Sequence, residues 1–159
     1  MIVYHGTTDI IKKPDISFSK NNLDFGRGFY LTTYKEQAQK WAVRKASRSR
    51  KKAIVNIYEL NINEKEYNVL KFKNADEEWL EFICKCRSGE NVYNNYDIII
   101  GNVADDDVFK TVDMYFKGLW DKERTIKELR YYKINDQICI VKQDVLDKVL
   151  EFKDAYEVE

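Results

Sequence analysis

The fold is decided by residues 24–33, DFGRGFYLTT, and the rest of the chain is organised around them. Gly26 and Gly28 stand one residue apart, and glycine suits backbone that turns sharply or lies close against another group. Residues 29–32 are typical of a β-strand. The tetrapeptide at 33–36 has the spacing of a helix capping box. We therefore expect a loop, a strand and a helix start, in which the loop is either a tight turn between core elements or main chain held against a ligand.

The composition indicates one globular domain that spans residues 1–159. The chain is 44% apolar and 34% charged, as in an ordinary globular protein, and its length is sufficient for a sizeable core. Lys and Arg together number 27, and so do Asp and Glu, so no global charge draws the chain to nucleic acid or membrane. It is rich in aromatic residues, which is common both in plain cores and where planar ligands stack.

The cysteines and the N-terminus point to the cytoplasm. Cys84, Cys86 and Cys139 form no CxxC pair, and the single histidine leaves few ligands for zinc, so we expect reduced thiols and no metal. Residues 1–5 lack the features of a signal peptide, and no apolar run reaches the ~20 residues that span a bilayer. Delivery to a target cell by a dedicated secretion machine stays open, and we expect no membrane partner.

Periodicity predicts an α+β domain in which strands and helices are mixed. The run 97–101 is fully apolar, so we expect that strand to be buried on both faces. Residues 10–22 are predicted to be an irregular excursion and residues 87–96 a loop. The other expected strands are 2–5, 29–32, 53–60, 69–72, 130–134 and 137–141, and the expected helices are 34–50, 76–86 (capped by Asp76), 105–116, 121–129 (capped by Asp121) and 144–152.

A basic cluster closes the predicted helix 34–50. Cations at a helix C-terminus complement the helix dipole and usually form a solvated face. The alternative is that they meet a phosphate-bearing substrate. The residues are Arg44, Lys45, Arg48, Arg50, Lys51 and Lys52.

Two short motifs carry a resemblance to a known group of enzymes. His5-Gly6-Thr7 ends the first strand, and Tyr30 follows Gly26-x-Gly28 within the second. This pattern resembles the ADP-ribosyltransferase superfamily, on its diphtheria-toxin and poly-ADP-ribose-polymerase side. Residues 24–33, Trp41-Ala42, 96–101 and 136–139 look like a small bacterial family of uncharacterised proteins grouped with that fold. The resemblance implies an ADP-ribosyltransferase-like split β-sandwich core with peripheral helices.

The resemblance also implies NAD as a substrate. Such enzymes break the nicotinamide–ribose bond through an oxocarbenium-like transition state. Gly6 would offer its backbone to the carboxamide, and His5 would bind a ribose hydroxyl. Tyr30 would stack on the nicotinamide, with Trp41, eleven residues later, as the second wall. By periodicity alone Trp41 is equally a core residue of its helix, and His5 a structural histidine.

The third catalytic position departs from the superfamily pattern. Members usually carry Glu at the start of a late strand, where Gln137 stands here; an amide can hold a ribose hydroxyl but cannot act as a base. A register shift of one residue would place Asp136 there instead. Arg27 is a candidate for the pyrophosphate or else a solvent-facing loop residue. Thr7 and Asp24 are further candidates for the wall of the site.

The resulting hypothesis is a mono-ADP-ribosyltransferase that modifies a protein or a nucleic acid. Kinship with bacterial toxins and conflict-system effectors suggests a similar role, and a neutralising partner protein would fit that role. One alternative is an NAD glycohydrolase, for which water is the acceptor. Another is an inactive descendant that binds NAD, a nucleotide end or a partner protein. RNA 2′-phosphotransferases, which share a related fold, need basic residues where this chain has Tyr30.

Overall fold

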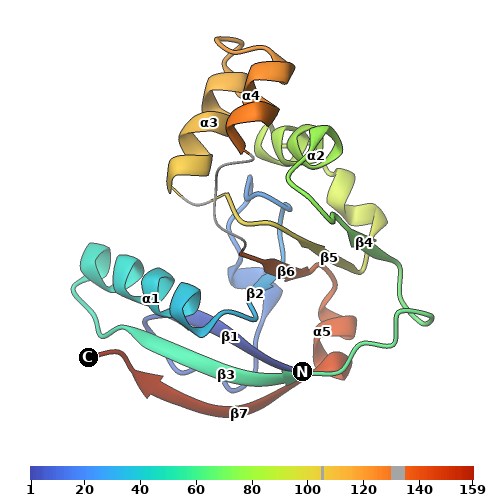
Figure 1. Ribbon diagram of the computed structural model, residues 1–159. Coiled ribbons are helices and arrows are strands. Elements are labelled where there is room, and N and C mark those ends of the chain that lie inside the picture. Colours follow the sequence, from blue (N-terminus) through green and yellow to red (C-terminus); the bar gives the residue numbers. More distant parts are fainter. Residues whose placement is uncertain (105, 130–134) are drawn as a thin grey trace.

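The computed structural model describes residues 1–104, 106–129 and 135–159 (Figure 1). This part of the chain is a mixed α+β structure with two sheets. The strands are β1 (Ile2–Thr7), β2 (Phe29–Leu31), β3 (Ile54–Leu60), β4 (Val69–Lys71), β5 (Ile98–Gly101), β6 (Gln137–Ile140) and β7 (Leu150–Glu157). The helices are α1 (Lys35–Ser49), α2 (Glu77–Arg87), α3 (Asp106–Phe116), α4 (Lys122–Leu129) and α5 (Gln143–Val149).

The two sheets meet at residues 24–33. One sheet has the strand order β1-β3-β7 and the other β2-β6-β5-β4. Tyr4 on β1 and Thr32 directly after β2 exchange backbone hydrogen bonds of 2.8 and 3.0 Å, which join the sheets. β5 lies inside its sheet, between β6 and β4, and Ile98 and Ile99 are fully buried, as its apolar sequence predicts.

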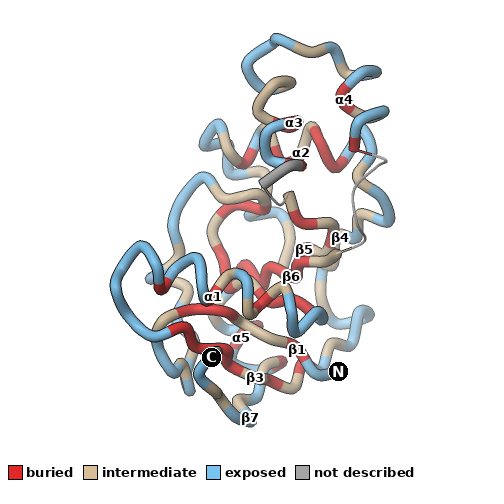
Figure 2. Tube along the Cα trace, turned by 60° about the vertical axis from the view of Figure 1, so that its left-hand side comes forward, coloured by how far each residue is buried: buried red, intermediate tan, exposed pale blue. Residues whose placement is uncertain are grey.

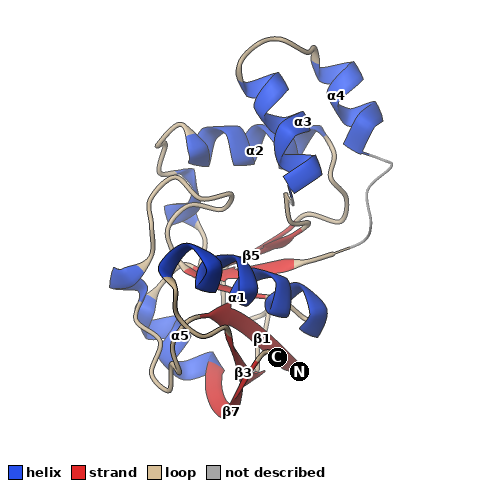
Figure 3. Cartoon of the chain, turned by 90° about the vertical axis from the view of Figure 1, so that its left-hand side faces the viewer, coloured by secondary structure: helices blue, strands red, loops and turns tan. Residues whose placement is uncertain are grey.

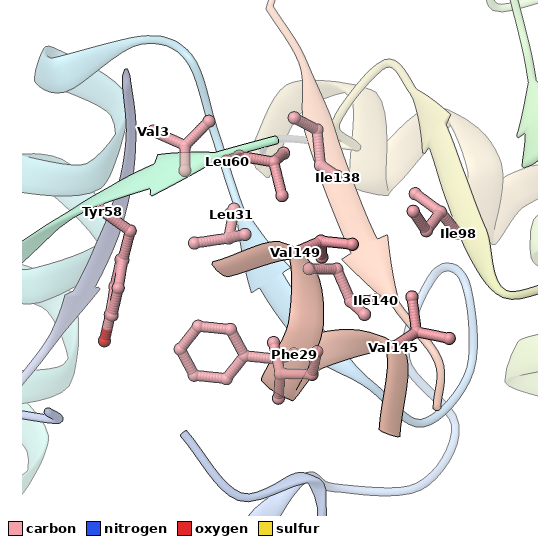
Figure 4. Close-up of a cluster of buried hydrophobic side chains, with 11 residues drawn as sticks. Val3, Phe29, Leu31, Tyr58, Leu60, Ile98, Ile138, Ile140, Val145 and Val149 are labelled. Atoms are coloured by element: carbon pink, nitrogen blue, oxygen red, sulfur yellow. The ribbon is translucent and has the colours of Figure 1, made fainter. Parts of the chain in front are cut away.

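The main core lies between the two sheets. Side chains alternate along a strand, so Phe29 and Leu31 of β2 point into this core while Tyr30 points to the opposite face. Figure 4 shows side chains from both sheets and from α5 converging on it. The buried members are Val3, Phe29, Leu31, Tyr58, Leu60, Ile98, Ile138, Ile140, Val145, Leu146 and Val149.

Helix α1 covers the other face of the first sheet (Figure 3). Ala38, Ala42 and Ala46 are spaced by four residues and form a buried stripe that packs with Val55 of β3. Their small side chains let the helix approach the strands closely. Because the alanine stripe is buried against the first sheet, only the other faces of α1 can contact further groups.

Helices α2, α3 and α4 cover the far face of the second sheet (Figures 1 and 2). Trp79 of α2 is fully buried there, and its indole N–H donates to the carbonyl of Asn102 at 3.1 Å. Cys139 of β6 belongs to the same buried cluster. All three cysteines are free thiols, and burial raises the pKa of Cys86 to about 12.

Two of the three predicted helix caps are confirmed. The carboxylate of Asp76 accepts from the Trp79 N–H at 3.2 Å, and that of Asp121 accepts from the Arg124 N–H at 2.8 Å. The capping box predicted at Thr33 is wrong. Helix α1 begins one residue later than that box requires, with Tyr34 at its N-cap and no side-chain cap.

The predicted closing helix 144–152 is also wrong in its last three residues. Helix α5 ends at Val149, and β7 begins at the next residue and pairs with β3 along its length. Tertiary pairing overrides a short local pattern here. The strand predicted at 130–134 lies outside the described residues. Within the described ranges, no helix combines the length and the apolar character needed to cross a membrane.

Candidate functional site

A cavity of about 1180 Å³ opens where β1, β2 and the start of β6 meet α1. Most of the predicted site residues line it, although they come from four separate elements. These residues are His5, Thr7, Tyr30, Trp41 and Gln137, together with Asp24. Gly6, Arg27 and Asp136 are not among the lining residues.

Alternation along β1 explains why His5 and Thr7 face the cavity and Gly6 does not. Gly6 faces α1, and a Cβ at Gly6 would lie only 1.9 Å from the carbonyl oxygen of Ala38. The carbonyl of Gly6 accepts a hydrogen bond from Nζ of Lys45 at 3.0 Å. The glycine is therefore required by helix packing, and its carbonyl already has a partner.

His5 is held as a neutral imidazole. Its Nδ1 lies 2.7 Å from the carbonyl oxygen of Tyr30, and because a carbonyl only accepts, Nδ1 carries the proton. The ring stacks on Phe29 with centroids 4.5 Å apart. Burial, followed by the nearby charge of Lys45, lowers the pKa of His5 to about 3. Nε2 therefore offers a lone pair to a hydroxyl donor.

Tyr30 fixes the glycine loop. Its hydroxyl donates to the Gly26 carbonyl at 2.6 Å and accepts from the Phe25 N–H at 3.0 Å. Burial, followed by the Cys139 thiol and the Asp24 charge, raises its pKa well above the usual value. The hydroxyl is thus structural, and the ring is the part of Tyr30 that can serve a ligand. In the described part of the chain it does not stack on Trp41.

Gln137 is paired with a carboxylate. Its Nε2 donates to Oδ2 of Asp24 and to the carbonyl of Asn102, each at 3.2 Å. The side chain is buried, so its orientation is restrained. Both amide hydrogens have acceptors, which leaves Oε1 as the atom that can accept from a ligand.

Asp24 is itself locked in place by Arg87 at the end of α2. Oδ1 of Asp24 accepts from Nη2 of Arg87 at 2.6 Å and from Nε at 3.1 Å, and the two side chains are only 15% and 12% exposed. The guanidinium lies 3.9 Å from the ring centroid of Phe109. Sequence reasoning left Asp24 without a role and missed Arg87, because no local pattern links residues 63 positions apart.

Asp136 and Arg27 have structural partners instead. Oδ1 of Asp136 accepts from the Thr32 hydroxyl at 2.7 Å and from the Thr33 N–H at 2.9 Å, so it ties β6 to the end of β2. The register in which Gln137 faces the cavity is the one found. Arg27 donates to the Ser17 carbonyl at 3.1 Å, within the excursion 10–22.

The basic end of α1 divides into two groups. Arg44, Lys45 and Arg48 line the cavity with Trp41, since positions i, i+3, i+4 and i+7 share one helix face. Arg50, Lys51 and Lys52 do not line it. The phosphate-binding alternative therefore concerns only the first group.

Comparison with known proteins identifies a family for this chain. No curated protein and no solved structure matches the chain. A family described as "Protein of unknown function (DUF3990)" matches residues 1–152. The chain therefore belongs to the family described by those words.

Proposed function

We propose that the protein is a mono-ADP-ribosyltransferase that uses NAD as its substrate. The observation that carries the proposal is that His5, Tyr30, Trp41 and Gln137 line one cavity, with the carboxylate of Asp24 hydrogen-bonded to Gln137. The resemblance to ADP-ribosyltransferases assigns these positions to nicotinamide and ribose, although Gln137 stands where members usually carry Glu. Two sheets that meet along β1 and β2 agree with the split β-sandwich core of that superfamily.

The cavity walls suit the two halves of nicotinamide riboside. The rings of Tyr30 and Trp41 offer faces for the planar nicotinamide, and offset stacking contributes about 0.5–1.5 kcal/mol beyond area burial. Nε2 of His5 and Oε1 of Gln137 would accept hydrogen bonds from ribose hydroxyls. Neutral His5 suits this role, because an imidazolium could only donate.

Asp24 supplies the negative charge that the amide of Gln137 lacks. Cleavage of the nicotinamide–ribose bond moves its electron pair onto the departing nicotinamide and leaves positive charge on the ribose. Oδ2 of Asp24, held 3.2 Å from the Gln137 amide, places negative charge beside the ribose-binding oxygen. Arg87 binds Oδ1, so it fixes the carboxylate and partly compensates its charge. In this arrangement Asp24 is a positioning and electrostatic residue.

The direct test is nicotinamide release from NAD by the purified protein, with and without a cell lysate as the source of acceptors. Transfer requires label from NAD to appear on a macromolecule, whereas release by the protein alone indicates that water is the acceptor. Gln137→Ala should abolish either activity, and Trp41→Ala should reduce either activity by about tenfold. Phe116→Ala serves as the control, because Phe116 is exposed on α3 and does not line the cavity.

A catalytically inactive NAD-binding module is the second candidate. The amide at 137 and the Arg87–Asp24 ion pair favour it, since no free carboxylate faces the ribose-binding oxygen in the described part of the cavity. Calorimetric binding of NAD that depends on Trp41, without nicotinamide release under any acceptor condition, would select this candidate over the enzyme.

A further inference from the structure

The mouth of the cavity concentrates positive charge in a chain whose total charge is zero. Two segments supply it, the excursion 10–22 and helix α1. Among the described lining residues are six cations and the three acids Asp9, Asp15 and Asp24. The cations, here called the basic wall, are Lys12, Lys13, Lys20, Arg44, Lys45 and Arg48.

Much of this charge is not neutralised by ion pairs. In the described part of the chain, no carboxylate forms an ion pair with Lys12, Lys13, Lys20 or Arg48. Two of the three lining acids are instead paired with cations outside the lining, Asp24 with Arg87 and Asp9 with Lys51. The positive charge of Lys20 also contributes, after burial, to a lowered pKa of Lys45, so the two sides of the basic wall are close enough to repel.

Large aromatic rings stand beside these cations. Phe18, in the excursion 10–22, is 86% exposed, and Phe109, on α3, is 49% exposed; both line the cavity. Exposing a phenylalanine to this extent forgoes the free energy of burying it. Cationic grooves with exposed aromatic rings are the usual surface for single-stranded nucleic acids, whose bases stack on the rings.

We propose that the basic wall, together with Phe18 and Phe109, binds a single-stranded nucleic acid. The phosphates lie along the lysines and arginines, and bases stack on the two phenylalanines. The pyrophosphate of NAD carries two negative charges, fewer than the basic wall can accept. The next step rests on the function proposed above. The nucleic acid is the acceptor of ADP-ribose, and the opening of the cavity leads it to the ribose held by His5 and Gln137.

The transfer of ADP-ribose needs no reactant other than NAD and the nucleic acid. A nucleophilic nitrogen or oxygen of the strand forms a bond to the anomeric carbon of the nicotinamide ribose. The bond from that carbon to the nicotinamide nitrogen breaks, and its electron pair leaves with neutral nicotinamide. The proton of the nucleophile passes to solvent.

Binding is measured without NAD, by fluorescence anisotropy of labelled single-stranded RNA and DNA of about 12 nucleotides, within the usual site size. The variant Lys12→Gln/Lys13→Gln/Lys20→Gln should bind at least tenfold more weakly. The slope of log affinity against log salt concentration should become shallower by about 2, since three phosphate contacts are lost. The matched control is Lys65→Gln/Lys73→Gln/Lys127→Gln, which removes three exposed cations outside the cavity and should change neither quantity.

The aromatic contribution separates nucleic acid from other polyanions. Phe18→Ala should weaken oligonucleotide binding by about tenfold and leave the binding of inorganic polyphosphate unchanged. Phe116→Ala, which removes a half-exposed ring outside the cavity, should affect neither. An acidic peptide that binds as tightly as the oligonucleotide, independently of Phe18, would overturn the proposal in favour of a protein partner.

Two further outcomes distinguish this proposal from the proposed function. If the three-lysine variant loses NAD affinity and keeps oligonucleotide affinity, the basic wall serves NAD and the inference is wrong. If the oligonucleotide binds as described but neither NAD binding nor nicotinamide release occurs, the nucleic-acid surface stands and the transferase function fails. With active protein, label from NAD should appear on the oligonucleotide, and labelling of protein alone would refute the acceptor assignment.

Discussion

Replacing Gln137 by glutamate should not create a more active enzyme, although glutamate is the residue that the superfamily pattern places there. Nε2 of Gln137 lies 3.2 Å from Oδ2 of Asp24. Gln137→Glu would place two carboxylate oxygens at this distance. At an effective dielectric constant of about 20, two unit charges so close repel by about 5 kcal/mol, an upper bound before the side chains move.

This repulsion is large enough to decide the protonation state. Since about 1.4 kcal/mol corresponds to one pH unit, the pKa of the introduced carboxyl would rise by up to nearly four units above its usual value. At neutral pH it would hold its proton and donate it to Asp24, much as the amide does. Nicotinamide release should therefore stay near the wild-type rate.

The reciprocal exchange provides the informative comparison. In Asp24→Asn/Gln137→Glu, the introduced amide can accept from Arg87 and donate to the carboxylate at 137. That variant should release nicotinamide faster than Gln137→Glu at neutral pH. The measurements are release rate and thermal unfolding for both variants across the acid and neutral range.

The sign of the stability change is fixed by linkage. A carboxyl whose pKa is raised by folding does not destabilise the protein below the pKa that it has in the unfolded chain. Its loss of free energy of unfolding grows as the pH rises through the pKa that it has in the folded protein. Gln137→Glu should thus approach wild-type stability in acid and lose it towards neutral pH. If Gln137→Glu were equally stable across the whole pH range and as active as Asp24→Asn/Gln137→Glu, Asp24 would not control the protonation state at position 137.

Three further predictions concern other parts of the site. Gly6→Ala should lower the free energy of unfolding in urea by about 3 kcal/mol or more, because its Cβ would collide with the backbone of Ala38, which cannot yield as a side chain can. Because folding lowers the pKa of His5 from 6.5 to about 3, wild-type stability should fall as the pH drops through this window, and His5→Gln should flatten that part of the thermal-unfolding profile. Trp41→Ala should weaken calorimetrically measured NAD binding by about tenfold, whereas Val43→Ala, an exposed neighbour on α1, should leave it unchanged.

Local patterns in the sequence predicted most of the elements that position the site. The glycine loop, the strand that carries Tyr30 and the helix that carries Trp41 all appear close to their expected bounds. Alternation also predicted that Asp136 and Gln137 point to opposite faces. These features depend on residues within a few positions of each other, so a single sequence contains the information needed to find them.

The failures share one physical cause. Thr33 does not cap α1, because its hydroxyl binds Asp136, 103 positions away. Residues 150–152 were assigned to a helix, yet they pair with β3, about 90 positions earlier. In each case a distant partner outweighed the local preference.

By itself, the sequence determined most of the strands and helices and the faces on which their side chains lie, because backbone periodicity and turn chemistry act over a few residues. Only the tertiary structure decided that Asp24 meets Gln137 and Arg87, and that half of the basic cluster lines the same cavity as Lys20. Such pairs depend on how two sheets and their covering helices pack. Packing is a property of the whole chain, which no short stretch of it contains.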